Sequence, residues 1–114
     1  MAKLTMVEFP GDAAAHSAKF FEDVFSWSST AYGPEYLDVQ IGGNQTLGFQ
    51  QDRSEAPGAP LVVFEVEDLV AMRTAIEQAG GVVTVEPFDF PGGTRLHFRE
   101  PSGNELAVWT PITG

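Results

Sequence analysis

The chain has 114 residues, which fits one domain with a core large enough to fold without disulfides or a structural metal. Sixteen acidic against six basic side chains give a formal net charge of −10. This charge argues against nucleic acid and anionic membranes as partners, because both require a basic surface. The acidity would attract a cationic ligand, or it serves only to keep the protein soluble. Because the sequence has no cysteine, no signal-peptide core and no long apolar run, we expect a cytoplasmic protein.

The first half of the chain alternates between strand-like and helix-like patterns. Asp12 follows Pro10-Gly11 and suits the N-cap of a helix whose apolar stripe recurs every three or four residues. A Ser/Thr-rich strand follows Trp27, and two further strands have the period-two alternation of a sheet with one packed face. The expected elements are a strand over 6–9, a helix over 13–25, the short strand after Trp27, strands over 36–41 and 46–50, and a linker over 51–60.

The second half repeats this order. Asp68 again suits an N-cap, and Gly80-Gly81 suits a left-handed C-cap. Pro101 and Gly103 are turn residues between two alternating runs, which predicts a hairpin. The expected elements are a strand over 61–66, a helix over 69–79, a strand over 82–86, a loop over 87–93, and hairpin strands over 94–99 and 105–109.

The repeat decides the architecture. We expect an α+β fold made of one domain, residues 1–114, with two tandem βαβββ modules at residues 4–50 and 61–111. The modules would form a cupped, mostly antiparallel eight-stranded sheet with the helices on its convex side. Each helix can cover only one face of its strands, so the other face is left open as a trough.

Two strings resemble motifs of the vicinal-oxygen-chelate superfamily, which includes glyoxalase I, extradiol dioxygenases and bleomycin-resistance proteins. They are Phe20-Phe21-Glu22-Asp23-Val24-Phe25-Ser26-Trp27, similar to the family's FYE-x-vFGW, and Glu100-Pro101-Ser102-Gly103-Asn104, similar to its DPdGN. Ser26 and Glu100 depart from the usual glycine and aspartate. The resemblance implies a homodimer, often with exchanged modules, and a small-molecule ligand.

Metal-using members of this superfamily place four His, Glu or Gln ligands near the strand middles. The resemblance carries these positions onto Thr5 or Met6, Gly48, Leu61 and Ala107. These side chains do not supply the three or four nitrogen or oxygen donors that a divalent ion needs. We therefore expect no metal or other cofactor, and no Lewis acid for glyoxalase or dioxygenase chemistry.

His97 is the most prominent titratable residue on the expected open face. It has three interpretations: a histidine paired with a carboxylate, a general base oriented by Glu65 or Glu105, or a ligand of a relocated metal site. Arg95 is expected to pair with one of these glutamates or to bind a ligand carboxylate.

Aromatic side chains also fall on the open face. Tyr36 and Trp109 either stack against a flat ligand or fill the trough. Phe88 and Phe90 either close over the trough as a lid or anchor their loop. The candidate ligand-binding residues are Tyr36, Asp38, Glu65, Phe88, Phe90, Arg95, His97 and Trp109.

The leading hypothesis is a metal-free binding protein, similar in character to bleomycin-resistance proteins. It would sequester a flat, cationic or aromatic antibiotic-like molecule between aromatic rings and carboxylates. The first alternative is a lyase or isomerase that uses His97 with a trough glutamate, and the second is a metalloenzyme with relocated ligands. A third class is an interaction module without a small ligand.

Overall fold

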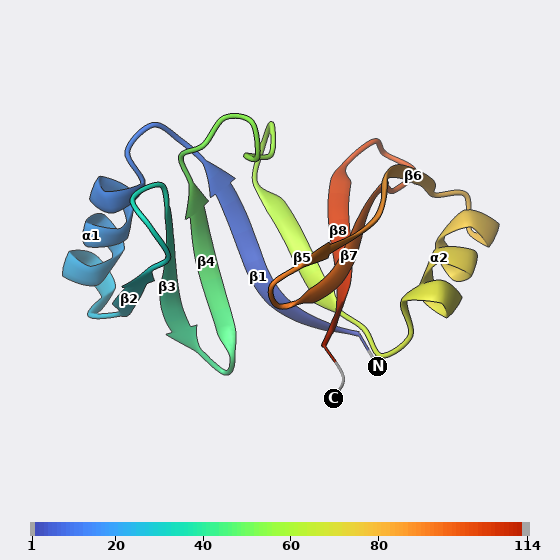
Figure 1. Cartoon of the computed structure of the whole chain (residues 1–114), viewed down its shortest axis with the longest axis horizontal. Helices are drawn as coiled ribbons and strands as arrows, with labels where there is room; N and C mark the ends of the chain where they lie inside the picture. The colour runs from blue at the N-terminus through green and yellow to red at the C-terminus, as the bar shows by residue number, and fades with distance from the viewer. Residues whose placement is uncertain (1, 113–114) are drawn as a thin grey trace. The chain divides into compact units, whose positions relative to one another are not determined.

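The computed structural model describes residues 2–112, and it confirms the α+β class. These residues contain eight strands and two helices, divided between two compact units (Figure 1). The first unit comprises residues 5–61, and the second comprises residues 2–4 and 62–112. Neither helix in residues 2–112 has the length and hydropathy needed to span a bilayer.

The first unit is a four-stranded mixed sheet with one helix on one face. Its strands lie in the order β2-β3-β4-β1; β1 and β4 are parallel, and the other pairs are antiparallel. Ala14 and Ala18 of the helix pack against Val39 and Phe49, which gives this unit its own core. The elements are β1 (Lys3–Pro10), α1 (Ala14–Phe25), β2 (Ser28–Ala31), β3 (Tyr36–Gly42) and β4 (Gln45–Gln50).

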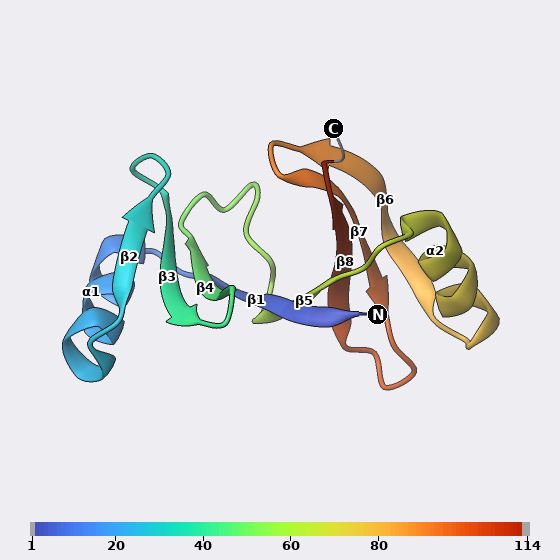
Figure 2. The same cartoon turned by 90° about the horizontal axis from the view of Figure 1, so that it is seen from below.

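The second unit repeats this arrangement. Its strands lie in the order β5-β8-β7-β6; β5 and β8 are parallel, and the others are antiparallel. Leu69 of the helix packs with Leu96 and Val108, and the helix runs beside its strands in Figure 2. The elements are β5 (Leu61–Glu65), α2 (Leu69–Gln78), β6 (Val82–Phe90), β7 (Gly93–Arg99) and β8 (Glu105–Pro111).

The predicted cap of the first helix is wrong. Ala13 is the N-cap residue and its side chain makes no cap hydrogen bond; Asp12 instead pairs with Arg53 at 3.1 Å. The N–H of Ala14, which has no partner within the helix, donates to the side-chain oxygen of Gln51 at 3.1 Å. One N–H group of the first turn is therefore satisfied by a residue that is distant in the sequence, which no local pattern reveals.

Both predicted caps of the second helix are confirmed. The Asp68 carboxylate accepts a hydrogen bond from the N–H of Ala71 at 3.0 Å. At the other end, Gly80 has a φ of +95°, and the N–H of Gly81 donates to the carbonyl of Ile76 at 2.8 Å. Glycine suits this position because it lacks the Cβ that disfavours left-handed backbone.

The predicted loop over 87–93 is wrong, because β6 continues to Phe90. Phe88 pairs with Arg95 and Phe90 with Gly93, so both phenylalanines belong to a strand, and neither a lid nor an anchored loop describes them. Pro87 is tolerated because it falls at a register irregularity between Val85 and Phe88, where its missing N–H leaves no ladder bond broken. The two phenylalanines are thus fixed by strand pairing.

Candidate functional site

The predicted site residues lie on the sheet faces opposite the helices. In the second unit, Leu96 and Val108 pack under α2, so alternation turns Arg95, His97 and Trp109 to the other face. In the first unit, Leu37 and Val39 pack under α1, which turns Tyr36 and Asp38 away from it. The structure thus divides the candidates into two groups, one on each unit.

Arg95 and His97 form the centre of the group on the second unit. Nε and Nη2 of Arg95 both reach Nε2 of His97, at 3.1 and 3.0 Å. A guanidinium has donors only, so Nε2 must be the acceptor and the ring is neutral with its proton on Nδ1. That nitrogen faces a carboxylate oxygen of Glu105 at 3.5 Å, and the same oxygen accepts a hydrogen bond from Thr84 at 2.8 Å.

The surroundings of His97 favour this neutral form. Burial lowers the pKa of His97, the positive charge of Arg95 lowers it further, and Glu105 opposes both effects. The side chain is only 14% exposed. With Nε2 accepting from Arg95 and Nδ1 protonated, His97 can take a substrate proton only after Arg95 moves. The general-base interpretation therefore stays a prediction that requires this movement.

Aromatic rings surround the Arg95 guanidinium. Its Cζ atom lies 5.6 Å from the ring centre of Phe88 and 6.0 Å from that of Phe90, within cation–π range. The Phe90 ring contacts Trp109 with centres 5.8 Å apart, and strand pairing places Trp109 opposite Arg95. We call these five residues the aromatic face: Phe88, Phe90, Arg95, His97 and Trp109.

Glu65 lies at the border of the aromatic face. Strand pairing places it opposite Trp109, and its carboxylate lies 3.7 Å from the ammonium group of Lys3. Its side chain is 25% exposed, so this ion pair is partly screened by solvent. Both candidate glutamates of this unit, Glu65 and Glu105, therefore already have polar partners.

A second group surrounds Gly48 in the first unit. Gly48 pairs with Glu8 on one side and with Asp38 on the other, so two carboxyl groups flank a position without a side chain. The Tyr36 hydroxyl covers this position and lies 3.5 Å from the sulfur of Met6. We call this group the carboxyl cluster: Met6, Glu8, Tyr36, Asp38 and Gly48.

The carboxyl cluster is more buried than alternation alone indicated. Glu8 is only 6% exposed, and Oδ1 of Asp38 is buried without a hydrogen-bond partner among residues 2–112. Burial raises the pKa of Asp38, the Tyr36 hydroxyl lowers it in part, and the charge of Glu8 raises it. Asp38 therefore holds its proton to higher pH than an exposed aspartate, and in that form it is a hydrogen-bond donor.

The positions implied for family metal ligands do not fit a metal. Phe9 packs under α1, so alternation selects Met6 over Thr5 for the β1 position. A Cβ on Gly48 would lie 2.5 Å from the Tyr36 hydroxyl oxygen. Leu61 and Ala107, 1% and 0% exposed, have no donor atoms in their side chains. Within residues 2–112, no three His, Cys, Asp or Glu side chains are grouped to hold a metal ion.

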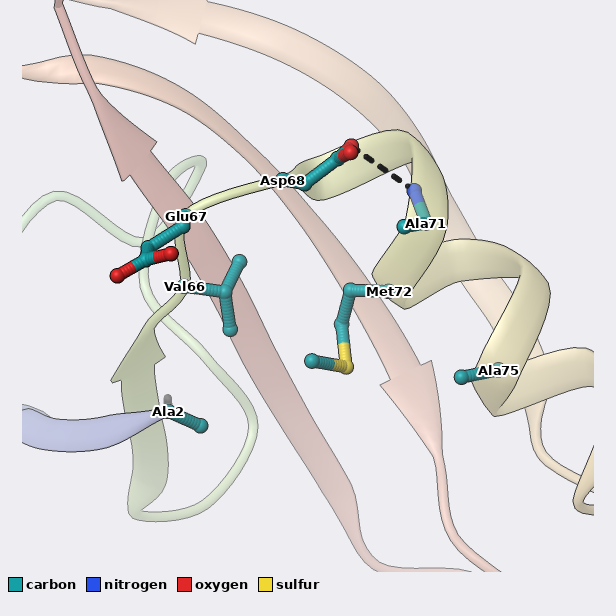
Figure 3. Close-up of a pocket in the computed structure, with 7 residues that line it drawn as sticks. All are labelled: Ala2, Val66, Glu67, Asp68, Ala71, Met72 and Ala75. Carbon is teal, nitrogen blue, oxygen red and sulfur yellow. Dashed lines mark hydrogen bonds between the residues drawn. The ribbon is translucent and has the colours of Figure 1, made fainter.

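A separate small pocket lies beside α2 (Figure 3). It has a volume of about 220 Å³, and Val66, Met72 and Ala75 give it an apolar wall. The Asp68 carboxylate at its rim already accepts the N–H of Ala71. This pocket contains none of the predicted site residues.

Comparisons with known proteins identify a family whose model matches nearly the whole chain. The model of the Glyoxalase/Bleomycin resistance protein/Dioxygenase superfamily matches residues 3–108. The chain is 30% identical to an anthracycline biosynthesis protein, DauV, of Streptomyces sp. (strain C5), over 86% of this chain and 42% of the relative. The chain thus spans about two fifths of that protein's length.

Solved structures share the fold at low sequence identity. A methylmalonyl-CoA epimerase of Streptomyces coelicolor superposes with a TM-score of 0.77 and 13% identity, over 97% of this chain and 95% of that one. An Mn(II)-bound glyoxalase of Novosphingobium aromaticivorans gives 0.72 and 17%, over 95% of this chain and 38% of that one. Likeness at this identity concerns the fold alone.

Proposed function

The chain belongs to the Glyoxalase/Bleomycin resistance protein/Dioxygenase superfamily, and from this premise we propose that it binds a planar aromatic small molecule without using a metal ion. The observation that carries the proposal is the aromatic face. Phe88, Phe90 and Trp109 lie around one guanidinium on paired strands. The metal-free part rests on the donor-poor side chains at the family positions.

Strand pairing makes these rings suitable for stacking. Phe88 and Trp109 flank Arg95 in adjacent strands, so the backbone fixes their spacing before a ligand arrives. Each favourable aromatic contact with a flat ligand adds about 0.5–1.5 kcal/mol beyond the burial of apolar area. Phe88 is 39% exposed, which leaves ring surface for such a contact. Aromatic side chains also lose little conformational entropy on binding.

The curated relative supports the ligand class. DauV is named as a protein of anthracycline biosynthesis, and anthracyclines are built on fused, flat rings. This chain covers 42% of that protein, so we take from it only the shape of a candidate ligand. The proposal concerns binding alone. Sequestration of an antibiotic-like molecule and catalysis of a reaction on it would each be a further function.

Tryptophan fluorescence tests the proposal. Trp27 stacks on Phe25 in the first unit with ring centres 4.5 Å apart, so Trp27→Phe leaves Trp109 as the single reporter. We expect saturable quenching of Trp109 by naphthalene-sized ligands and loss of that quenching in Phe90→Ala. Phe20→Ala, an exposed phenylalanine on α1, is the matched control and should quench normally. Absence of saturable quenching by every ligand tried would count against the function.

A second candidate function is an isomerase or lyase that moves a proton. The observation that favours it is Asp38, a carboxyl with a raised pKa and a buried oxygen that has no partner among residues 2–112. Carbonyl compounds with an acidic C–H bond, incubated with the protein in D₂O, would gain deuterium at carbon. Mass spectrometry measures the gain, and Asp38→Asn should abolish it. Exchange at the rate of buffer alone excludes this candidate.

A further inference from the structure

We infer that an exposed apolar side of α1 binds a second copy of this chain, with the two helices antiparallel about a two-fold axis. Three large apolar side chains form this surface: Phe20, Val24 and Phe25, which we call the α1 patch. Each is between 50% and 57% exposed. The patch lies on the first unit, so this contact does not depend on the ligand proposed for the aromatic face of the second unit.

The side chains of the α1 patch are contiguous. Val24 lies one helical turn after Phe20, so these two side chains are neighbours on the helix surface. The Phe21 ring joins Phe20 to Phe25, with ring centres 5.3 and 5.9 Å away. Phe25 in turn stacks on Trp27 with centres 4.5 Å apart. Exposed apolar residues that occur singly are normal on a protein surface, whereas a contiguous group of them indicates a contact site.

The corresponding helix of the second unit has no such patch. The repeat gives both units the same order of elements, and each helix packs on its own strands. Within α2, all of which the structure describes, Val70 is the single exposed large apolar side chain. Arg73 of that helix forms ion pairs with Glu77 and Glu86. Packing on the sheet therefore does not require exposed apolar residues, and the α1 patch needs another explanation.

Charge complementarity favours a second copy as the partner. Lys19 and Asp23 border the patch and pair at 2.9 Å within one chain, while both remain largely exposed. They are equally spaced from Phe21, so an antiparallel pairing centred there brings Lys19 of each copy level with Asp23 of the other. Phe20 then lies within about 3 Å of Val24 of the other copy along the helix axis. A two-fold interface requires this kind of self-complementary surface.

The net charge of −10 opposes association but does not act at the patch itself. Lys19 and Asp23 together contribute no net charge, and Glu22 is turned to β2, where it accepts the Ser29 hydroxyl at 2.6 Å. Charges away from the contact are screened over about 8 Å at 0.15 M salt. One helix from each copy makes an interface below about 1,200 Å², a size typical of weak complexes. We therefore expect a reversible equilibrium between monomer and dimer.

Sedimentation equilibrium at 0.15 M salt tests the contact over protein concentrations from about 1 to about 500 μM. We expect the average mass to rise with concentration from that of one 12.3 kDa chain towards twice that value. Val24→Asp places a charge in the apolar contact and should weaken the dimer at least about ten-fold. Val70→Asp makes the same change at the exposed valine of α2 and should weaken it less than about two-fold.

Charge reversal identifies the surface that associates. Asp23→Lys places two lysines at the contact and Lys19→Asp places two aspartates there, so neither variant should self-associate. An equimolar mixture of the two should form a heterodimer, because each lysine then meets an aspartate of the other copy. Asp12→Lys and Arg53→Asp reverse another exposed ion pair of the same unit, and each of these controls should associate like the unaltered protein.

Three results would overturn the inference. The first is a chain that stays monomeric at every concentration. The second is a dimer that Val24→Asp and Val70→Asp affect equally, as a dimer with exchanged modules would be. The third is a mixture of the two charge variants that associates no better than each alone. Should Val24→Asp fail to fold by circular dichroism, Phe20→Ser replaces it, and an unchanged dimer in that variant also overturns the inference.

Discussion

Substituting alanine for Gly48 tests how the carboxyl cluster is packed. Glycine within a strand costs about 0.5–1 kcal/mol relative to alanine, so the backbone alone favours the change. The new Cβ, however, would lie 2.5 Å from the Tyr36 hydroxyl oxygen and 3.3 Å from Oδ1 of Asp38. Displacing the tyrosine should cost about 1–3 kcal/mol, the usual penalty for overpacking. We expect a net loss of about 1 kcal/mol in the free energy of unfolding.

The Tyr36 hydroxyl should account for most of this loss. Tyr36→Phe removes the hydroxyl oxygen, which is the atom closest to the new Cβ. The next two contacts of that Cβ are Cζ of residue 36 at 3.2 Å and Oδ1 of Asp38 at 3.3 Å, and these atoms need to shift by only tenths of an ångström. In the phenylalanine background, Gly48→Ala should therefore be nearly neutral, which gives a coupling of about 1 kcal/mol between the two sites. Gly11→Ala is the control, because a Cβ there meets nothing within 4 Å.

Urea denaturation of the four proteins of this cycle measures the coupling, provided that the m-values agree. The control variant should add to Tyr36→Phe within about 0.5 kcal/mol, as independent sites do. A coupling below that limit, or a Gly48→Ala protein as stable as Gly11→Ala, would refute the reasoning. The family metal-ligand position on β4 would then be open to a side chain, and the steric part of the argument against a metal would no longer hold.

Three further predictions concern stability. Because burial raises the pKa of Asp38, stability should fall as pH rises from the ordinary aspartate range through the folded-state pKa. Asp38→Asn should abolish this fall, so the asparagine protein should gain in stability relative to the wild type between acidic and neutral pH, as measured by urea denaturation across pH. Asp68→Ala should cost about 1 kcal/mol in thermal denaturation, and Asp12→Ala, which breaks only an exposed ion pair, less than about 0.5 kcal/mol. Gly93→Ala should cost about 3 kcal/mol or prevent folding by circular dichroism, because its Cβ would clash with the main-chain carbonyl of Thr110.

Local periodicity was sufficient to predict the faces of the sheets. The alternation of Arg95, Leu96 and His97 depends only on backbone geometry, so it holds wherever the strand is placed. The same is true of Asp68, whose cap partner lies three residues away. Features that depend on near neighbours in the chain are therefore those that the sequence predicts correctly.

Structural features that depend on residues distant in the sequence could not be predicted from local sequence patterns. Gln51 accepts the N–H of Ala14 at the start of α1, whereas Asp12, which has the residue type of an N-cap, lies one residue before the N-cap position. Pro87 suggested a loop, yet the outer strand of the second unit accommodates it at a register irregularity. Alternation along β1 turns Glu8 to the face opposite Phe9, but its burial depends on residues outside its own segment, such as those of the paired strand β4.

The hydrogen bonds from Arg95 to His97 show that a cation on a sheet can have a neutral partner as well as a charged one. The sequence predicts that Arg95 pairs with Glu65 or Glu105 or binds a ligand carboxylate, and it gives no sign of the contact with His97. Residues two apart on one strand share a face, and burial lowers the pKa of His97, which favours the neutral ring that can accept from the guanidinium. Protonation would convert that acceptor into a second cation.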